Sequence, residues 1–554
     1  MQITTHIAFH YGNLKLYNHP PSTKLLRQRF CLPLVSLRTR RSPVVRKMFF
    51  SMAFTLTNTL IILASLMLVV ISKGILEERR KRRNIEKNVS ENGESGLIEP
   101  PSPRKLPIIG HLHLLGGYEV PYQAFSALGE KFGKIVKLQL GGVKCIVVNG
   151  EKNVREALVT KGSHFDSRPN FERYQQLFDG NKENSLAFCD WSETQKVRRD
   201  MLRVHTFPRA FTNNFFALEN IISIETKNML SQITPEANTD LKPIIAKNCA
   251  NIFLSHFCSK SFDVQDERFV KTIENFDEIF FEVNQGYVAD FLPFLTPLLK
   301  KNMERMKCLT HEIRQFVEDE IIEKRFDEFD SESEPADYVE GLIKYVKKDN
   351  ADFDWNTALF ALEDIIGGHA AVSNFLTQVF AFLVKEPHVQ KKIQEEIDEN
   401  VGKNKTVTIG DRNVMPYTEA TIFEAVRMIA SPIVPRVANR DSSINGYKIE
   451  KGSVIFMNNY ELNISEELWD QPTKFKPERF LKNGNLVKPD HFLPFGGGRR
   501  SCLGYRMVQL ISFGVIGGFL QNFTILPADK ESYKIQVGSL ALKKDTFKFK
   551  FVKR

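Results

Sequence analysis

The chain has 554 residues, a formal net charge of +10 at pH 7, and a composition that is 42% hydrophobic and 26% charged. Its length alone would allow roughly three domains. The seven cysteines are too few and too scattered for a disulfide framework or a C-x-x-C metal site, so we expect reduced thiols. Much of the basic excess lies in residues 1–47 and 79–83, so the charge does not indicate a nucleic-acid-binding protein.

A basic leader and an apolar span open the chain. Residues 1–47 contain no Asp or Glu, and no residue from 48 to 72 is charged. Because roughly twenty apolar residues suffice to cross a bilayer, we predict one transmembrane helix at 48–72. A cleaved signal peptide is the alternative, but its apolar region is usually shorter, and here the charged segment 77–83 follows instead of a small-residue cleavage site.

The basic cluster 79–83 indicates that the rest of the chain lies on the cytosolic side of the membrane. We predict the endoplasmic reticulum membrane, because the uninterrupted apolar span fits an anchor better than an amphipathic presequence. The mitochondrion is the alternative, since acid-poor leaders with Arg and Ser resemble transit peptides. A start at Met48 or Met52 would leave the leader out of the mature protein.

Residues 73–103 form a basic and proline-rich linker, in which Pro100, Pro101 and Pro103 stiffen the backbone. A proline-rich ligand for a partner domain is the competing interpretation. No second hinge follows, so residues 104–554 are predicted to form one large domain. Helical patterns dominate it, with strand-like segments such as 134–150 in the minority, which predicts a mainly α fold with small β-sheets.

A helix of roughly 45 Å is predicted at 355–385, from the run WNTALFALEDIIGGHAAVSNFLTQVFAFLVK. A second helix, at 418–430, contains the tetrad E-x-x-R between Glu424 and Arg427. After it, residues 431–460 alternate and break at Asn445-Gly446, which predicts a hairpin with a tight turn. The segment KFKPERF then ends at residue 480.

Near the C-terminus, FGGGRRSCLG presents one cysteine from a glycine-rich loop with the spacing F-x-x-G-x-R-x-C-x-G. The ordinary interpretation of an isolated cysteine is a small buried hydrophobe. Five matched positions, preceded by the long helix, E-x-x-R and KFKPERF in this order, favour another interpretation. Over residues 95–554 the sequence resembles the cytochrome P450 family.

The resemblance implies the cytochrome P450 fold and heme b, iron protoporphyrin IX, with the Cys502 thiolate as its axial metal ligand. In the loop, Gly498 would supply an unusual torsion, Gly504 would let the next helix approach the porphyrin, and Phe495 would shield the sulfur. Arg500 would neutralise a propionate.

The resemblance also implies that Trp191 and Arg436 contact the haem propionates, although a solvated strand arginine is the alternative for Arg436. Gln195 occupies the position where the family carries the arginine of W-x-x-x-R. Replacement candidates on the same helix are Lys196, Arg198 and Arg199.

A structural network is implied for Glu424, Arg427 and Arg479. In the family, the arginine of the KFKPERF segment joins the Glu and Arg of the helical tetrad in a buried three-way contact. We expect this network to support the haem loop without taking part in catalysis.

The largest departure from the family lies in the 355–385 helix, where G-x-[DE]-T is usual. Gly367 and Gly368 are retained as an oxygen groove, but Ala370 and Ala371 replace the acid and the alcohol that deliver protons. Three consequences are open: a hydroxyl of the substrate completes the relay, bound water suffices, or the reaction is a dehydrogenation or rearrangement.

His369 is a candidate catalytic residue, because imidazole titrates near neutrality and could supply the proton that the missing acid and alcohol would deliver. Packing against a neighbouring helix is an equally good interpretation of it. For holding water, Ser373 and Asn374 are further candidates beside the glycine pair.

The segment GGHAAV most resembles the spook and spookier group of insect Halloween P450s. This implies an early step of ecdysteroid synthesis on a sterol. The chain has no P-loop and no G-x-G-x-x-G, so we expect electrons for O2 activation from NADPH-cytochrome P450 reductase. Alternatives are a sterol-binding haem protein without turnover and a P450 isomerase or desaturase.

Overall fold

The computed structural model describes residues 96–348 and 354–554. The predicted leader and transmembrane helix, and most of the linker, lie outside these residues. Of the described residues, Leu97–Lys105 and Ile109–Arg554 belong to one unit. This unit contains the helices, sheets and cavity of the described chain.

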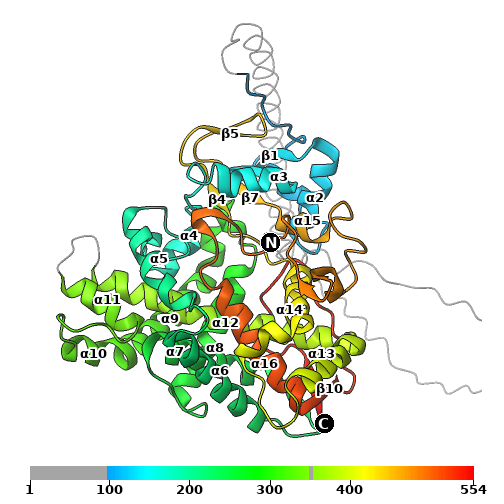
Figure 1. The fold of residues 1–554 in the computed structure, drawn as a ribbon. Coiled ribbons are helices and arrows are strands. Elements are labelled where there is room, and N and C mark those ends of the chain that lie inside the picture. The colour runs from blue at the N-terminus through cyan, green and yellow to red at the C-terminus, as the bar shows by residue number, and fades with distance from the viewer. Residues whose placement is uncertain (1–95, 349–353) are drawn as a thin grey trace, which may run out of the picture. The chain divides into compact units, whose positions relative to one another are not determined.

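Helices dominate this unit, which confirms the predicted mainly α class (Figure 1). Their bounds are α2 (Pro121–Phe132), α3 (Glu151–Arg155), α4 (Glu172–Leu177), α5 (Glu193–Thr206), α6 (Asn213–Ser231), α7 (Leu241–Cys258), α8 (Glu267–Asn284), α9 (Thr296–Val317), α10 (Glu323–Glu328), α11 (Tyr338–Lys347), α12 (Trp355–Lys385), α13 (Pro387–Asn400), α14 (Pro416–Ile429), α15 (Asn459–Ile464) and α16 (Tyr505–Asn522).

The strands form small sheets, as predicted. A four-stranded sheet has the order β1-β2-β7-β4, a three-stranded sheet the order β10-β11-β3, and two hairpins pair β5 with β6 and β8 with β9. Their bounds are β1 (Ile135–Leu140), β2 (Val143–Val148), β3 (Asn238–Asp240), β4 (Arg436–Val437), β5 (Ser442–Ile444), β6 (Tyr447–Ile449), β7 (Val454–Met457), β8 (Leu481–Lys482), β9 (Asn485–Leu486), β10 (Phe523–Pro527) and β11 (Lys548–Lys553).

Two strand predictions are confirmed in detail. The segment 134–150 folds into the antiparallel pair β1 and β2, with Ile135 opposite Val148. The hairpin of β5 and β6 turns at Asn445 and Gly446, whose φ angles are 49° and 79°. Positive φ at both central residues is what a two-residue turn of this kind requires, which explains the Asn-Gly pair.

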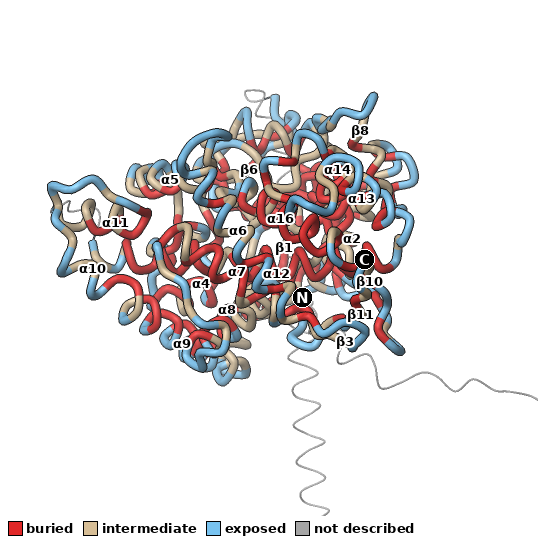
Figure 2. The backbone as a smooth tube through the Cα atoms, turned by 60° about the horizontal axis from the view of Figure 1, so that its bottom comes forward, coloured by how far each residue is buried: buried red, intermediate tan, exposed pale blue. Residues whose placement is uncertain are grey.

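The predicted long helix is α12, and it forms the centre of the main hydrophobic core together with α7 and α16 (Figure 2). Asp354 caps its start by accepting a hydrogen bond from the Thr357 N–H at 2.8 Å, and Pro387 follows its end. Of the described helices, α12 alone is long and apolar enough to cross a membrane, and 83% of its most apolar window is buried inside the protein. We therefore regard it as a core helix.

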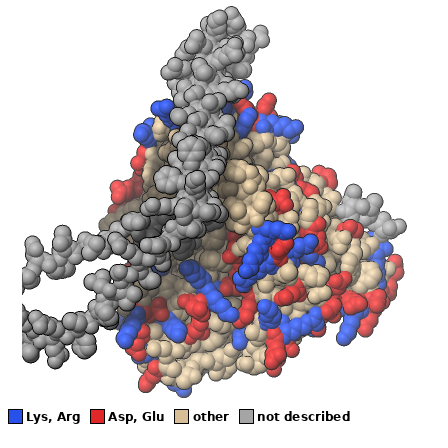
Figure 3. Space-filling model, turned by 180° about the vertical axis from the view of Figure 1, so that it is seen from behind, with Lys and Arg blue, Asp and Glu red and all other residues tan. Residues whose placement is uncertain are grey.

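The basic residues are concentrated in a few segments of the sequence, but they do not gather on the face seen in Figure 3. On that face, Lys and Arg side chains are interspersed with Asp and Glu. The net charge of +10 does not produce a continuous basic surface there.

Candidate active site

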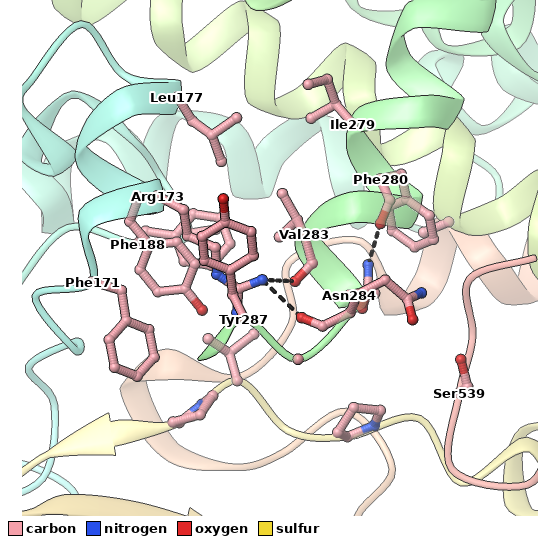
Figure 4. Close-up of a pocket in the computed structure, with 18 of the residues that line it drawn as sticks. Phe171, Arg173, Leu177, Phe188, Ile279, Phe280, Val283, Asn284, Tyr287 and Ser539 are labelled. Atoms are coloured by element: carbon pink, nitrogen blue, oxygen red, sulfur yellow. Dashed lines mark hydrogen bonds between the residues drawn. The ribbon is translucent and has the colours of Figure 1, made fainter. Parts of the chain in front are cut away.

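A cavity of about 440 Å³ lies against α12, within the range of roughly 300–1,000 Å³ that small-molecule sites occupy. Its wall is mostly aromatic and aliphatic and draws on α4, α8, α9, α12, the strand β7 and the loops around them. Figure 4 shows part of this wall, including Phe171, Leu177, Phe188, Ile279, Phe280 and Val283. The cavity thus suits a large apolar ligand.

One stripe of α12 faces the cavity. Between residues 358 and 384, every residue is buried except Asp364, Gly367, Gly368 and Ala371, and these four line the cavity. Their spacing of three and four residues places them on one helix face. The predicted groove residues Gly367 and Gly368 therefore lie at the ligand cavity, as does the alanine in the alcohol position.

The glycine pair also has a packing reason. A Cβ on Gly367 would lie 3.2 Å from the Phe276 ring, and a Cβ on Gly368 would lie 3.0 Å from the Phe253 ring. These contacts are tighter than side chains normally make, so glycine lets α8 and α7 approach α12 closely.

The structure places His369 outside the cavity lining, buried against α8. Its ring packs edge-on against Phe276 with centroids 5.3 Å apart, and Nδ1 lies 2.6 Å from the Ile366 carbonyl oxygen. Burial lowers the pKa of His369 to about 4, so the imidazole is neutral at pH 7. Its other nitrogen, Nε2, has no partner among the described residues.

Ser373 and Asn374 are buried on α12 and engaged by protein groups. The Ser373 hydroxyl donates to the Ala370 carbonyl at 3.1 Å, and the Asn374 amide donates to Asp277 at 2.9 Å. Neither residue lines the cavity, and neither does Ala370.

The glycine-rich loop is closed by a hydrogen bond from the Cys502 N–H to the Phe495 carbonyl at 3.0 Å. Gly498 has a φ of 66°, and a Cβ at this position would lie 2.1 Å from the Leu158 carbonyl oxygen. Only glycine fits both conditions. The Phe495 ring lies 5.8 Å from the Tyr505 ring at the start of α16, so the loop is packed onto that helix.

Cys502 lies directly before α16, whose N-cap is Gly504. Cys502 is exposed, yet desolvation by the surrounding protein raises the pKa of its thiol, while the N–H groups of Gly504 and Tyr505 and the nearby Arg199 guanidinium act in the opposite direction. Helix N-termini and cations favour a thiolate over a thiol. A Cβ on Gly504 would meet no atom within 4 Å, so the protein around it does not itself require glycine.

Four arginines gather beside this loop. Arg436 and Arg500 are buried, and the Arg436 guanidinium donates to the Arg500 carbonyl at 3.2 Å. Burial, followed by repulsion from Arg168, Arg500 and Arg199, holds the pKa of Arg436 well below its usual value. The same two causes lower the pKa of Arg168 to about 9 and that of Arg199 to about 10.

Sequence reasoning missed Arg168, which no motif marks. Its guanidinium donates to the Val434 and Pro435 carbonyls at 2.9 and 3.0 Å, so it holds the strand segment that carries Arg436. Arg500 donates to the backbone carbonyls of Asp166 and Cys189.

Trp191 joins the same region, half-buried before α5. The guanidinium groups of Arg499 and Arg500 lie 4.9 and 5.7 Å from its ring centre. Gln195 instead donates to the Leu186 carbonyl at 2.6 Å, away from the arginines.

Of the three replacement candidates on α5, Arg199 approaches the loop. Its guanidinium donates a 2.6 Å hydrogen bond to the carbonyl of Ser501, which is the residue before Cys502. Arg198 donates to the Asn184 and Glu183 carbonyls, and Lys196 is exposed near Glu193. Arg199 lies one helical turn beyond Gln195. The fixed spacing of W-x-x-x-R marks only position 195, so the motif does not identify Arg199.

The predicted network residues come together in the interior. Arg427 makes two 2.8 Å hydrogen bonds to the two oxygens of Glu424, and Arg479 lies 3.0 Å from the same carboxylate. The Arg427 and Arg479 guanidinium groups also lie 5.1 and 5.7 Å from the Trp469 ring centre. The side chains of Glu424 and Arg427 have no exposed surface.

Comparison with known proteins identifies the family. A family model described as Cytochrome P450 matches residues 100–551. Cytochrome P450 307a1 of Drosophila melanogaster is 37% identical over 506 residues, covering 86% of this chain and 93% of that protein. Steroid 17-alpha-hydroxylase/17,20 lyase of Mesocricetus auratus is 32% identical over 464 residues, covering 80% and 89%. Cytochrome P450 1A1 of Chelon saliens is 28% identical over 443 residues, covering 76% and 84%.

These matches confirm the family resemblance, and the Drosophila relative is consistent with the Halloween group. The family is one of enzymes that bind haem through a cysteine thiolate and receive electrons from a redox partner. The chain belongs to the cytochrome P450 family and is a haem-thiolate monooxygenase.

Proposed function

We propose that this monooxygenase oxidises a sterol at an early step of ecdysteroid synthesis. The observation that carries this proposal is the mainly apolar cavity of about 440 Å³ along α12, which suits a rigid fused-ring skeleton. The relatives support it, because one is named a steroid hydroxylase and another is an insect P450.

Cys502 is the proposed haem ligand. Desolvation raises the pKa of its thiol, and the N–H groups of Gly504 and Tyr505 and the charge of Arg199 oppose that shift. Gly498 sets the loop geometry that presents the sulfur. When bound, the haem supplies O2 activation, which a thiolate ligand promotes. Phe495 packs on the Tyr505 ring of α16 beside the loop, and its proposed role is to shield the sulfur when haem is bound.

The arginine cluster fits the two propionates of a haem. Burial, and after it repulsion from neighbouring arginines, lowers the pKa values of Arg168, Arg199 and Arg436, and Arg436 Nε is buried without a partner among the described residues. Carboxylates placed beside them would relieve this repulsion. We assign Arg436 and Arg500 to the propionates, with Trp191 beside them and Arg199 in place of the missing W-x-x-x-R arginine.

Arg436→Met is expected to weaken haem binding without weakening the haem-free fold. The change removes a buried cation that is repelled by three others, while it deletes a charge-assisted hydrogen bond to a propionate, so haem release should accelerate by about tenfold or more. Haem transfer to apomyoglobin measures the rate. Arg440→Met, at an exposed position nearby, is the control, and equal release from the two variants contradicts the assignment.

Proton delivery differs from the family pattern, because Ala371 lines the cavity and Ala370 is buried. Neither side chain carries a proton, and His369 is buried and neutral behind Phe276. We propose that water on the Gly367–Gly368 stripe or a hydroxyl of the substrate supplies the proton. The same alanines support, as second candidates, a desaturase or isomerase and a sterol-binding haem protein without turnover.

We further propose that NADPH-cytochrome P450 reductase supplies the electrons. The proposed location is the endoplasmic reticulum membrane, with residues 48–72 as the anchor, residues 73–103 as the linker and residues 104–554 as the cytosolic catalytic domain. The mitochondrion is the alternative location. A retained leader 1–47 would favour it, because this segment resembles a transit peptide.

Reconstitution tests the function. The full-length protein with reductase, NADPH and a panel of sterols is expected to give a product that mass spectrometry identifies as an oxidised sterol. Binding spectra with no NADPH consumption would instead favour the sterol-binding protein, and product without electrons would favour an isomerase. Failure of every sterol to bind contradicts the proposal.

A further inference from the structure

An ion pair from two helices contributes to the apolar cavity wall. Glu363 of α12 lines the cavity, and its Oε2 lies 3.2 Å from Nε of Arg314 on α9. The side chains of both residues are 8% exposed. Burying a charged pair of this kind carries a desolvation cost. Replacing both partners with well-packed apolar residues often leaves the stability of a protein unchanged or increases it. Stability alone therefore does not explain it.

Arg314 is fixed in position by several partners. Its Nη1 donates to Asp179 at 3.0 Å, its Nη2 donates to the Leu177 carbonyl at 3.2 Å, and its guanidinium lies 4.2 Å from the Phe360 ring centre. The arginine in turn holds one oxygen of Glu363, so the carboxyl group is oriented by groups outside the cavity.

The second oxygen of Glu363, Oε1, has no hydrogen-bond partner among residues 96–348 and 354–554. This atom is also not fully buried, so a ligand or water can reach it. Since Glu363 lines the cavity, this oxygen is the one left available to a ligand there. Burial raises the pKa of Glu363, and the Arg314 guanidinium opposes this shift. As a carboxylate the group accepts a hydrogen bond, and as an acid it also donates one, so either form can bind a hydroxyl.

The other charged residues of the wall are engaged elsewhere. Arg173 donates to the Val283 and Gln285 carbonyls at 3.0 and 2.8 Å (Figure 4). Asp364 accepts hydrogen bonds from the Ser185 hydroxyl and the Leu186 N–H at 2.8 and 2.5 Å. Glu119 is exposed and pairs with Lys534 at 2.7 Å.

Position along α12 sets the distance from the reacting end. Glu363, Gly367 and Ala371 are spaced four residues apart, so they fall on successive turns of nearly the same face. Eight residues at a rise of ~1.5 Å each separate Glu363 from Ala371 by about 12 Å along the helix axis. A rigid ligand that reacts near Ala371 would extend its far end toward Glu363.

We propose that Glu363, oriented by Arg314, recognises a hydroxyl group at the end of the substrate remote from the oxidised carbon. The inference rests on the proposed function and narrows the substrate class to apolar fused-ring alcohols whose hydroxyl lies roughly 10 Å from the reacting carbon. Glu363 is a specificity-determining residue, and Arg314 is its positioning residue.

Binding to the haem-loaded full chain tests this, with the spin-state shift of the Soret band as the readout and 7-dehydrocholesterol and its 3-deoxy analogue as probes. The wild type is expected to bind the alcohol about tenfold or more tightly than the deoxy analogue, since a hydrogen bond to an acidic group contributes this much. The double variant Glu363→Leu, Arg314→Met should bind the two probes equally. Glu363→Gln, which can still donate and accept, should retain part of the preference.

Glu312→Gln is the matched control, because Glu312 is an exposed acid on the same helix as Arg314. It should bind both probes as the wild type does. Wild-type affinities within about twofold of each other overturn the inference while leaving the proposed function standing. A preference that survives in the double variant also overturns it. If neither sterol binds, the proposed function fails and the inference with it. The comparison of the two probes on the wild type needs no variant, so it tests the inference even if a variant fails to fold.

Discussion

Cys502→Ser is expected to abolish both the thiolate-type Soret band of the reduced carbon-monoxide complex and monooxygenase turnover. A serine hydroxyl is a much weaker acid than a thiol, so it does not provide the anionic sulfur ligand that promotes O–O cleavage. The surrounding hydrogen bonds to the loop backbone are retained, because the Cys502 N–H and the Phe495 carbonyl are unchanged.

Absorbance spectra and product formation with reductase measure the effect. Cys308→Ser is the control, since Cys308 is exposed on α9 and should leave both signals unchanged. A Cys502→Ser protein that kept the thiolate-type band would show that another side chain holds the iron.

Glu424→Leu should cause the largest loss of stability among the substitutions considered. The change leaves the buried guanidinium groups of Arg427 and Arg479 without their carboxylate, and breaking a buried pair in this way costs about 3–5 kcal/mol. Arg427 would keep its bond to the Asn463 carbonyl and Arg479 its bonds to the 470–474 backbone, which do not neutralise the charges.

Urea unfolding of the purified protein, followed by circular dichroism, gives the free energy of unfolding, and haem content is measured in parallel. Lys300→Ala is the control, because it breaks an exposed i,i+4 pair with Glu304 at 3.6 Å that contributes no more than about 0.5 kcal/mol. If both variants unfold at the same urea concentration, the network does not support the fold as argued.

Local patterns predicted the elements that depend on local physics. The apolar run of α12, the helical period of α14 and the Asn-Gly turn between β5 and β6 each encode their own conformation in neighbouring residues. The Cys502 loop belongs to the same class, since its glycine torsions and its hydrogen bond to Phe495 span only a few residues. The domain boundaries at 72, 103 and 104 remain predictions.

The candidate site was only partly predictable. Gly367, Gly368 and Ala371 were found because a motif marks their positions, and the cavity stripe of α12 contains all three. His369 was named on the same motif, yet its place against Phe276 depends on how α8 packs, which the order of residues in α12 does not encode. Arg199 was one of three candidates on α5, and the contact with Ser501 distinguishes it from the other two.

The amino-acid sequence by itself determined the family, and it predicted the cysteine loop and the network of Glu424, Arg427 and Arg479, because each is marked by residue types at fixed spacing. Only the tertiary structure decided that Arg168 joins the arginine cluster and that Glu363 meets Arg314 at the cavity wall. Both contacts join segments distant in sequence, and their energies depend on burial and on neighbouring charges that exist only after the helices have packed.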